Sequence, residues 1–447
     1  MKKYQVILPV ALPLALVLSA GYMVKGRLEK SRQYASYISA AQEYERNGVM
    51  ADAVKSYQAA IALNPSIDAY LTMGQMFLDE GEGDEAADWY KEELLQNFPQ
   101  DVRTYCYGIQ AALLNDNQRD AFQIYDTYNK RKLHSDDVES AMQSIWNSFD
   151  LVGRYADVGG FSNSAGVAAV MIGNAWGYID TDGTKVLRDI YQSAGTFAEL
   201  TPVVDANGEA YYIDQEGNKK LPASYFQEKD DTLKQVERFG DIQSNMAMAY
   251  DGTVWNYYDL STYQKLFGGY KEATPITLGV GAVSEDGQNW ALISQMGELL
   301  TGYDYQGVAV DGKGVLCRTN AVFVRQDGYY RLVDHTTGQP INESRYQAVD
   351  AFNENTYAAV QKDGYWLFVN EAGEEKDVGN FDELKSLANG MAAARSGDRW
   401  GYIDENGNWL IEPQFYDENP FNANGSAFVK NKSDEWSLLR LVRYHHG

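Results

Sequence analysis

Short runs of small and apolar residues, each ending in a polar turn, recur through the last two-thirds of the chain. Two examples are "GVAAVMI" from Gly166 and "AVFVRQD" from Ala321. In the second example the turn Asp327-Gly328 leads into an aromatic-rich segment. Two such segments joined by Asp-Gly are typical of a β-hairpin. The pattern therefore predicts a β-rich region that starts near Val152.

The aromatic segment recurs eight times at nearly constant spacing. Successive copies are separated by 34, 45, 35, 40, 36, 34 and 36 residues. The copies begin at Trp176, Ala210, Trp255, Trp290, Tyr330, Trp366, Trp400 and Trp436. Three or four short strands per unit at this period predict a β-propeller of about seven blades, closed by strands shared between its ends. A linear β-solenoid is the alternative.

Two copies, at Trp176 and Trp400, share the letters Trp-Gly-Tyr-Ile-Asp, and each is followed by a turn that ends in Gly. On this motif, residues 160–443 resemble the WG-repeat (Trp-Gly repeat) family of bacteria. The resemblance implies a repeated β domain and supplies no chemistry. Middle units lose the Gly after Trp, and residues 227–241 form a charged insertion.

The tryptophans of the repeat have a structural explanation. Alternation along a strand places Trp, Tyr and Asp on one face and Gly and Ile on the other. Trp and Ile can then pack between sheets, Gly allows close approach of a backbone, and Asp can bond the amides of the turn. We therefore predict that six residues are structural repeat anchors: Trp176, Trp255, Trp290, Trp366, Trp400 and Trp436.

The region 32–150 has the composition of helices and a period of its own. Ala53, Ala87 and Ala121 lie 34 residues apart. Small residues at this interval mark places where helices approach closely, and Pro65 ends the first unit. The fragment "ADAVKSYQAAIALNP" resembles the second helix of a tetratricopeptide repeat. We expect three units, at about 34–65, 67–99 and 101–133, followed by a final helix.

This second resemblance implies a concave face that binds peptides or partner proteins. A rigid spacer between the N-terminus and the β region is the alternative, since the sequence shows no Asn/Lys pattern that clamps a peptide.

The N-terminus is apolar. Lys2 and Lys3 precede an uncharged run from Tyr4 to Val24. A helix needs about 20 apolar residues to cross a bilayer. We expect a single-pass membrane anchor with the bulk of the chain extracytoplasmic. A cleaved signal peptide is the alternative, although Leu18 fits a cleavage site poorly.

The sequence therefore predicts a multidomain chain of three parts. These are a cytoplasmic tip, transmembrane anchor and linker at 1–31, tetratricopeptide-like helical repeats at 32–150, and an all-β WG-repeat domain at 151–447.

Composition narrows the function. A net charge of −25 argues against a nucleic-acid partner, which requires clustered Lys and Arg. The two cysteines, Cys106 and Cys317, form no CxxC or Cys/His cluster. Only four histidines occur, and they suggest no Ser/His/Asp arrangement. We therefore predict no cofactor and no metal site.

Pairs of acidic residues are the remaining candidates for catalysis, because two carboxylates can hydrolyse a glycosidic bond. The pairs are Asp180/Asp182, Asp205/Glu209, Asp404/Glu405 and Asp417/Glu418. They recur at turns of successive units, where solvated hairpin ends are expected, so we predict no catalytic residue. Turn oxygens could also bind calcium, but the chain lacks the D-x-D-x-D-G spacing.

These observations favour a membrane-anchored, non-enzymatic scaffold or binding protein of the bacterial cell envelope with a protein or peptide partner. The alternative is a module that binds cell-wall polysaccharide or peptidoglycan, or a divergent glycan hydrolase.

Overall fold

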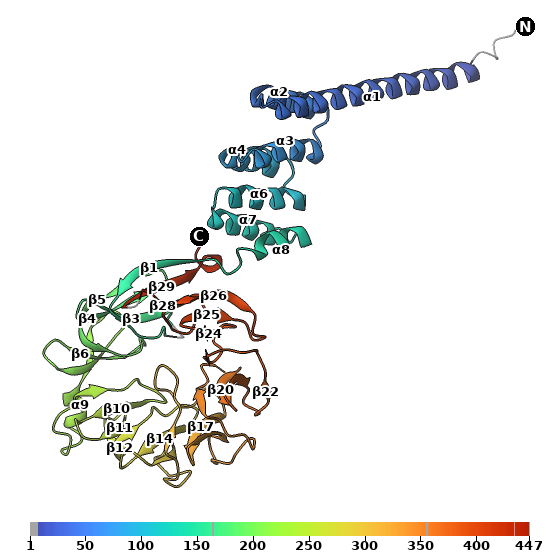
Figure 1. The fold of residues 1–447 in the computed structure, drawn as a ribbon. Coiled ribbons are helices and arrows are strands. Elements are labelled where there is room, and N and C mark those ends of the chain that lie inside the picture. The colour runs from blue at the N-terminus through green and yellow to red at the C-terminus, as the bar shows by residue number, and fades with distance from the viewer. Residues whose placement is uncertain (1–7, 163–164, 355, 433, 447) are drawn as a thin grey trace, which may run out of the picture. The chain divides into compact units, whose positions relative to one another are not determined.

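The computed structural model describes residues 8–162, 165–354, 356–432 and 434–446. The chain divides into two compact units, a helical unit that ends at Ser148 and a β unit, Phe149–His445 (Figure 1). Each unit is described separately below.

The helical unit is a series of antiparallel helices. Its α-helices are α1 (Leu8–Arg46), α2 (Met50–Leu63), α3 (Ile67–Asp79), α4 (Gly83–Trp89), α5 (Leu95–Asn97), α6 (Val102–Leu114), α7 (Gln118–Lys130) and α8 (Asp136–Gln143). A π-helical turn, Tyr90–Leu94, joins α4 to α5.

Polar side chains set where three of these helices begin. The Ala69 amide donates to the hydroxyl of Ser66 before α3, and the Arg103 amide donates to Asp101 before α6. Asn117 accepts from the Asp120 amide at the start of α7 in the same way. Each cap satisfies a backbone N–H that the first turn of a helix cannot pair.

The period of the helical unit differs by one residue from the prediction in its second repeat. Ala53 and Ala121 are fully buried, but between them the buried alanine is Ala86 rather than Ala87. Ala86 stands four residues before Tyr90, as Ala53 stands four before Tyr57. The π-helical turn that starts at Tyr90 holds one more residue per turn than an α-helix, which restores the register before the third repeat.

The predicted membrane anchor is not supported. The run Tyr4–Val24 begins in residues 1–7, which lie outside the described residues. Helix α1 does not end with this run but continues through charged residues to Arg46, and its Ala41 packs in the core of the helical unit. In the part of the chain that the structure describes, no helix is both long and apolar enough to cross a bilayer. The predictions of a transmembrane helix and of a single-pass, extracytoplasmic location are therefore wrong.

The β unit consists of antiparallel sheets built around the predicted hairpins. The first sheet consists, in hydrogen-bonded order, of β1 (Phe149–Tyr155), β29 (Glu435–Leu441), β28 (Ser426–Lys432) and β27 (Asp417–Glu418). The second sheet consists of β2 (Asp157–Val158), β3 (Val167–Ile172), β4 (Ala175–Asp180), β5 (Lys185–Ala194), β6 (Thr201–Asp205), β7 (Ala210–Ile213) and β8 (Lys219–Pro222). Helix α9 (Ala223–Gln227) follows β8, and a 3-10 turn, Val442–Tyr444, follows β29.

Five further sheets complete the β unit. They are β9 (Arg238–Phe239), β10 (Met246–Tyr250), β11 (Trp255–Asp259) and β12 (Lys265–Tyr270); β13 (Glu272–Ala273), β14 (Val280–Ser284) and β15 (Trp290–Ser294); β16 (Gly307–Val308), β17 (Ala321–Gln326) and β18 (Tyr329–Asp334); β19 (Ala348–Asp350), β20 (Ala358–Lys362), β21 (Tyr365–Val369) and β22 (Glu375–Lys376); and β23 (Glu383–Leu384), β24 (Ala392–Ser396), β25 (Arg399–Ile403) and β26 (Trp409–Phe415).

The sheets follow one another around a ring, as in a β-propeller (Figure 1). The ring closes where β1 pairs with β29, with Phe149 opposite Leu441, so the alternative of a linear solenoid is wrong. All eight predicted copies form their own hairpin within the described residues. Against a prediction of about seven blades, the eight units form seven sheets in the described residues, because two neighbouring units share one sheet, and the extra strand β1 closes the ring.

Two of the eight units share one hydrogen-bonded sheet. Tyr191 of β5 pairs with both Trp176 of β4 and Asp205 of β6, which joins β2–β8 into a single seven-stranded sheet. Elsewhere a sheet ends where the chain bends between an outer strand and the next inner strand, as between Phe415 of β26 and Asp417 of β27.

Candidate functional site

The six predicted anchor tryptophans lie at matching positions, at or next to the first residue of the third strand of their units. These strands are β4, β11, β15, β21, β25 and β29. Trp366 and Trp400 are buried, and the other four are half-buried against apolar clusters. Their indoles pack within the β unit, and cations lie over some of the rings, as Lys385 and Arg395 do over that of Trp400.

The tyrosine of the motif bonds to the residue that directly follows a strand leading into the next unit. The hydroxyl of Tyr402 donates to the carbonyl of Asn419, 2.9 Å away. Tyr178 donates in the same way to the carbonyl of Gly195, and Tyr257 to that of Thr274. Burial raises the pKa of Tyr402, because its ring is fully enclosed. These tyrosine hydroxyls therefore stabilise the fold of the β unit.

Three of the four acidic pairs close turns, as predicted. One Asp404 oxygen accepts from the amides of Asn406 and Asn408, at 2.8 and 2.9 Å. Asp180 and Asp205 accept from the amides two and four residues later in the same manner. These carboxylates are engaged with the backbone, which explains why Asp recurs at this position.

The fourth pair, Asp417/Glu418, does not lie at a hairpin end. Both residues form the innermost strand β27, where Glu418 is opposite Val429. The residues at the same register in the other seven units are all apolar: Val158, Ala194, Phe239, Ala273, Val308, Val349 and Leu384. Glu418 is thus a carboxylate at an apolar position of the repeat.

The surroundings of Glu418 make its charged form unfavourable. Although Glu418 keeps partial solvent contact, protein atoms enclose it closely. Burial raises the pKa of Glu418 to about 8; the nearby Lys385 opposes the rise, and the carboxylates of Asp350, Asp417 and Glu383 add to it.

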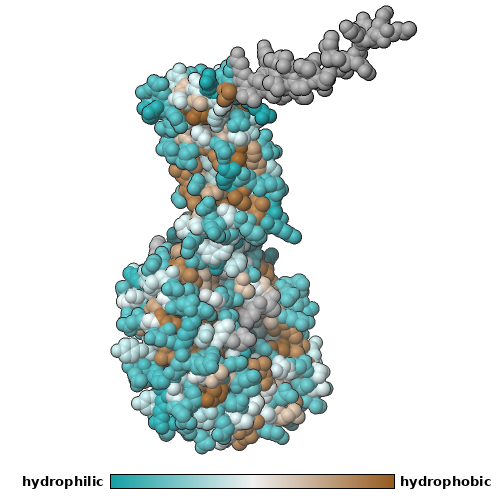
Figure 2. Space-filling view, turned by 90° about the vertical axis from the view of Figure 1, so that its right-hand side faces the viewer, coloured by the Kyte–Doolittle hydropathy of each residue, from teal (hydrophilic) through white to brown (hydrophobic). Residues whose placement is uncertain are grey.

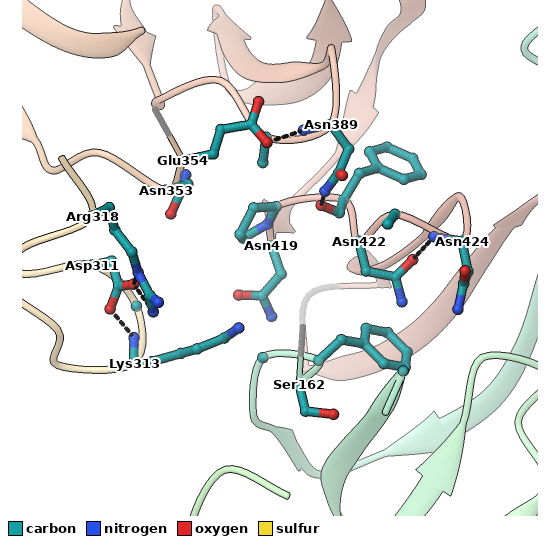
Figure 3. A pocket seen from close by; sticks show the side chains of 18 of the residues that line it. Ser162, Asp311, Lys313, Arg318, Asn353, Glu354, Asn389, Asn419, Asn422 and Asn424 are labelled. Atoms are coloured by element: carbon teal, nitrogen blue, oxygen red, sulfur yellow. Dashed lines mark hydrogen bonds and ion pairs between the residues drawn. The ribbon is translucent and has the colours of Figure 1, made fainter. Parts of the chain in front are cut away.

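A pocket of about 390 Å³ lies at the centre of the ring, which we call the axial pocket (Figure 3). Residues of five units line it, mostly from the loops that follow the innermost strands β2, β16, β19, β23 and β27. Such loops from separate units can meet only near the axis of the ring. The pocket is therefore the place where side chains that differ between units come together.

One wall of the axial pocket carries an ion pair. Arg318 donates from Nε to Asp311, 2.7 Å away, and only 4% of the Asp311 side chain is exposed. The other Asp311 oxygen accepts from the amides of Lys313 and Val315, at 2.8 and 2.9 Å. Asp311 is thus saturated with donors and holds the guanidinium of Arg318 in place.

Lys313 extends from the same loop across the pocket toward Asn419 (Figure 3). Burial lowers the pKa of Lys313, and the neighbouring Arg318 lowers it further, while Asp311 and Asp241 act in the opposite direction. Lys313 also lines a second cavity, of about 420 Å³, that contains Asp241 and Trp255.

Five asparagines contribute to the remaining wall: Asn353, Asn389, Asn419, Asn422 and Asn424. Two of them link units, since Asn353 donates to the Ser386 carbonyl and Asn389 donates to the Phe421 carbonyl. Asn422 accepts from the amides of Asn424 and Ser426 through its oxygen. Its Nδ2 is buried and has no hydrogen-bond partner within the described ranges.

The helical unit has a groove of its own, formed by two adjoining pockets of about 640 and 180 Å³. Both include Leu71 and Gln75 of α3. Gln42 of α1 lies in the first pocket and Gln110 of α6 in the second, so exposed glutamines of three successive first helices face one groove. We call this surface the glutamine groove.

Metal binding has no geometric support in the described part of the chain, where no three His, Cys, Asp or Glu side chains form a group able to hold an ion.

Sequence reasoning missed the residues of both sites. Asp311, Lys313 and Arg318 lie in the segment 309–320, which is longer than the matching segment 419–425 of another unit. This extra length is visible in the sequence as a step of 40 residues between Trp290 and Tyr330, and it could have identified the segment.

Three parts of the chain, residues 176–199, 330–366 and 400–436, match the family model described as WG containing repeat. The predicted resemblance to this family is confirmed at these places. No curated protein matches the chain.

Several solved structures are similar to the β unit in fold. The computationally designed Ika8 protein is 14% identical, with a TM-score of 0.41 over 64% of this chain and 99% of that one. BamB from Moraxella catarrhalis is 9% identical, with a TM-score of 0.33 over 64% and 85%. The WD40 β-propeller domain of Doa1 is 12% identical, with a TM-score of 0.34 over 66% and 96%. At these identities the similarity says nothing about ligands.

Proposed function

We propose that this chain is a non-enzymatic recognition protein whose helical unit, a short tetratricopeptide-like array, binds a peptide segment of a partner protein. The observation that carries the proposal is the glutamine groove. A glutamine amide both donates and accepts, so it matches the alternating N–H and C=O groups of an extended peptide.

The spacing of the glutamines suits such a peptide. Neighbouring packed helices lie roughly 8–10 Å apart, and an extended chain rises about 3.3 Å per residue. One glutamine therefore meets the peptide about every third residue. Leu71, which lines both pockets together with Gln75, offers an apolar contact for a peptide side chain.

The charges of the groove favour a neutral or weakly basic peptide. Its lining includes the carboxylates of Glu45, Asp79 and Asp137 and the cations Arg46 and Arg103. The groove thus has one more acidic than basic side chain, in line with the acidic character of the whole chain.

Among the described residues of the axial pocket, nothing favours the alternative of a glycan-binding or glycan-cleaving protein. Recognition of a sugar ring needs an exposed aromatic face. The two phenylalanines of the axial pocket, Phe161 and Phe421, are buried and pack against Phe428 and Tyr402, with ring centroids 5.0 and 4.7 Å apart. On the face shown in Figure 2, hydrophilic residues cover most of the β unit and hydrophobic residues appear in small groups.

The test uses the full-length chain and a phage library of random 12-residue peptides. We expect peptides enriched on the wild-type chain to bind the variant Gln75→Ala about tenfold more weakly, since one truncated contact at the centre of an interface costs about 1–2 kcal/mol. The control is Gln96→Ala, because Gln96 is also exposed and helical but lies outside the groove. Failure to enrich any peptide, or equal binding by both variants, would refute the proposal.

A further inference from the structure

The imidazole of His445, at the end of the β unit, lies against the turn that follows β4. Only 6% of this side chain is exposed. Its Nδ1 is 2.9 Å from an oxygen of Asp182. Its Nε2 is 2.9 Å from the Asn424 carbonyl oxygen and 3.0 Å from the Ser426 hydroxyl. One buried ring therefore connects the first unit of the β unit to the last.

These contacts bring together a serine, a histidine and an aspartate, which the sequence did not suggest. A catalytic serine needs space beside its hydroxyl for the reacting atom of a substrate. Ser426 is fully buried, and its hydroxyl donates to the Thr181 carbonyl, 3.3 Å away. The arrangement is therefore a structural contact and not a catalytic triad.

The oxygens around His445 match the charged form of its ring. A carbonyl oxygen and a carboxylate oxygen can only accept hydrogen bonds, so each ring nitrogen needs a hydrogen to satisfy the oxygen that it faces. A neutral imidazole has one N–H group, whereas the imidazolium has two. Loss of the proton would leave either Asp182 or Asn424 facing a nitrogen lone pair.

The other ionisable groups around His445 come from several elements. They are Asp182 in the turn after β4, Arg440 on β29, Asp150 on β1, and Arg443 and Tyr444 in the 3-10 turn. Arg440 lies 3.3 Å from Asp182 and 3.6 Å from Asp150, so these three groups form one ion-pair network. The guanidinium of Arg443 lies 5.1 Å from the centre of the Tyr444 ring. A proton on His445 balances the network, because it adds a second cation to two carboxylates.

The contacts of His445 lie behind one wall of the axial pocket. Gly166 and Asn424 line that wall (Figure 3). A Cβ on Gly166 would lie 2.9 Å from the Nδ2 of Asn424 and 3.4 Å from the Cγ2 of Thr181, so the backbone of Gly166 lies against both side chains. Because Thr181 directly precedes Asp182, the imidazole fixes two of the segments that pack together at this wall.

We propose that these contacts form a pH-sensitive clasp between the first and last units, which we call the histidine clasp: His445 with Asp182, Asn424 and Ser426. Histidine exchanges its proton between about pH 5 and 8. At the acidic end of this range the charged ring holds the Asn424 loop against the turn of the first unit. As the pH rises, the ring loses one of its two N–H groups, and the adjoining wall of the axial pocket loosens.

The direction of the pH dependence follows from the hydrogen bonds. The folded chain favours the charged ring and the unfolded chain does not, so the clasp contributes stability at low pH and loses part of it as the pH rises. Glu418 acts in the same direction, because its pKa of about 8 lies above the ordinary value. Comparison with a variant of His445 separates the two effects, since Glu418 is present in both proteins.

The test is urea unfolding of the full-length chain at pH 5 and at pH 8, for the wild type and for His445→Gln. At pH 5 we expect the variant to have an unfolding constant about tenfold above that of the wild type, since it lacks the bond of a charged donor. At pH 8 this ratio should be several-fold smaller. His134→Gln, at an exposed histidine of the helical unit, is the control and should change the unfolding constant at neither pH.

Amide hydrogen exchange locates the effect at the pocket wall. After correction for the intrinsic effect of pH, we expect residues 165–168 and 422–426 of the wild type to exchange faster at pH 8 than at pH 5. In His445→Gln they should exchange fast at both pH values. Asp182→Asn removes the charge but keeps an acceptor on a side chain that is 60% exposed, so it should fold and should also lose the pH dependence.

Two results would overturn the proposal. One is a ratio of unfolding constants for His445→Gln that is the same at pH 5 and pH 8. The other is exchange of the two segments that neither substitution changes. The histidine clasp includes no residue of the glutamine groove, so this proposal and the proposed function fail independently.

Discussion

The repeat unit around Trp400 and the unit around Tyr330 share the same hairpin. They differ in the outer strand beside the hairpin and in the loop that precedes it. In the first, β25 is flanked by the long outer strand β26, and Gly401 lies directly against its backbone. In the second, Arg331 takes the place of that glycine, and only isolated bridges, such as Tyr330 to Tyr346, continue the sheet in the described residues.

The loops after the innermost strands of these two units differ as well. The Trp400 unit connects β23 to β24 through residues 385–391, whereas the Tyr330 unit connects β16 to β17 through residues 309–320. The longer loop brings Asp311, Lys313 and Arg318 to the axial pocket. In the complete motif the side chains pack within the unit, whereas charged side chains of the axial pocket come from a loop in which the Tyr330 unit departs from the motif.

The largest effect is expected from the motif glycine. A Cβ on Gly401 would lie 2.4 Å from the Ile411 carbonyl oxygen and 2.8 Å from the Pro413 nitrogen, both backbone atoms of β26. We expect Gly401→Ala to lower the free energy of unfolding by about 3 kcal/mol, since a strand must shift to admit the methyl group. Urea unfolding followed by tryptophan fluorescence measures the change.

The matched control is Gly307→Ala in the Tyr330 unit. A Cβ there would meet only the Arg325 Cβ, at 3.9 Å, which is an ordinary contact. Equal destabilisation by the two substitutions would contradict the view that the complete motif is the more tightly packed version of the unit.

The repeated features of the fold could be predicted because a strand or turn that is uncertain in one copy of the repeat is clear when all the copies are compared. Eight copies at one spacing identify the hairpins, and Asp before a turn Gly identifies the ends of strands such as β4 and β25. The π-helical turn at Tyr90 could not be predicted, because its single extra residue is set by packing in the helical unit. The membrane anchor was inferred from an apolar run alone, without knowing that α1 continues beyond it to Arg46.

The candidate sites were harder to predict for a physical reason. The axial pocket assembles from loops that are far apart in the sequence, such as those of Arg318 and Asn422, and no local pattern encodes their meeting. Glu418 was read as a turn residue because Asp417 and Glu418 look like the turn acids of other units. Only the strand register shows that Glu418 occupies an apolar position.

Glu418 extends the comparison to a third unit. The Trp400 unit has Leu384 at this register and the Tyr330 unit has Val308, so only Glu418 places an ionisable group there. Its pKa is about 8 in the folded state against an ordinary value of 4.5. Between these two pH values the folded state holds a proton that the unfolded state has lost, so stability falls as the pH rises through this window.

We expect Glu418→Gln, which imitates the protonated form, to raise the free energy of unfolding by about 2 kcal/mol at pH 9 and to change it little at pH 4. Thermal unfolding at the two pH values measures the difference. Glu298→Gln, at an exposed glutamate, is the control and should leave both melting temperatures unchanged. A stabilisation that is the same at both pH values would show that ionisation of Glu418 is not its cause.

The smallest effect is expected from the hydroxyl of the motif tyrosine. Tyr402 donates to the Asn419 carbonyl, whereas the Tyr330 unit has Leu332 at the same register and makes no such bond. Tyr402→Phe keeps the ring and removes only this bond, so we expect a loss of about 1 kcal/mol in the free energy of unfolding. Tyr365→Phe is the control, because Tyr365 is 64% exposed. If Tyr402→Phe were as neutral as this control, the hydroxyl would add nothing to the framework, and the two units would differ in packing alone.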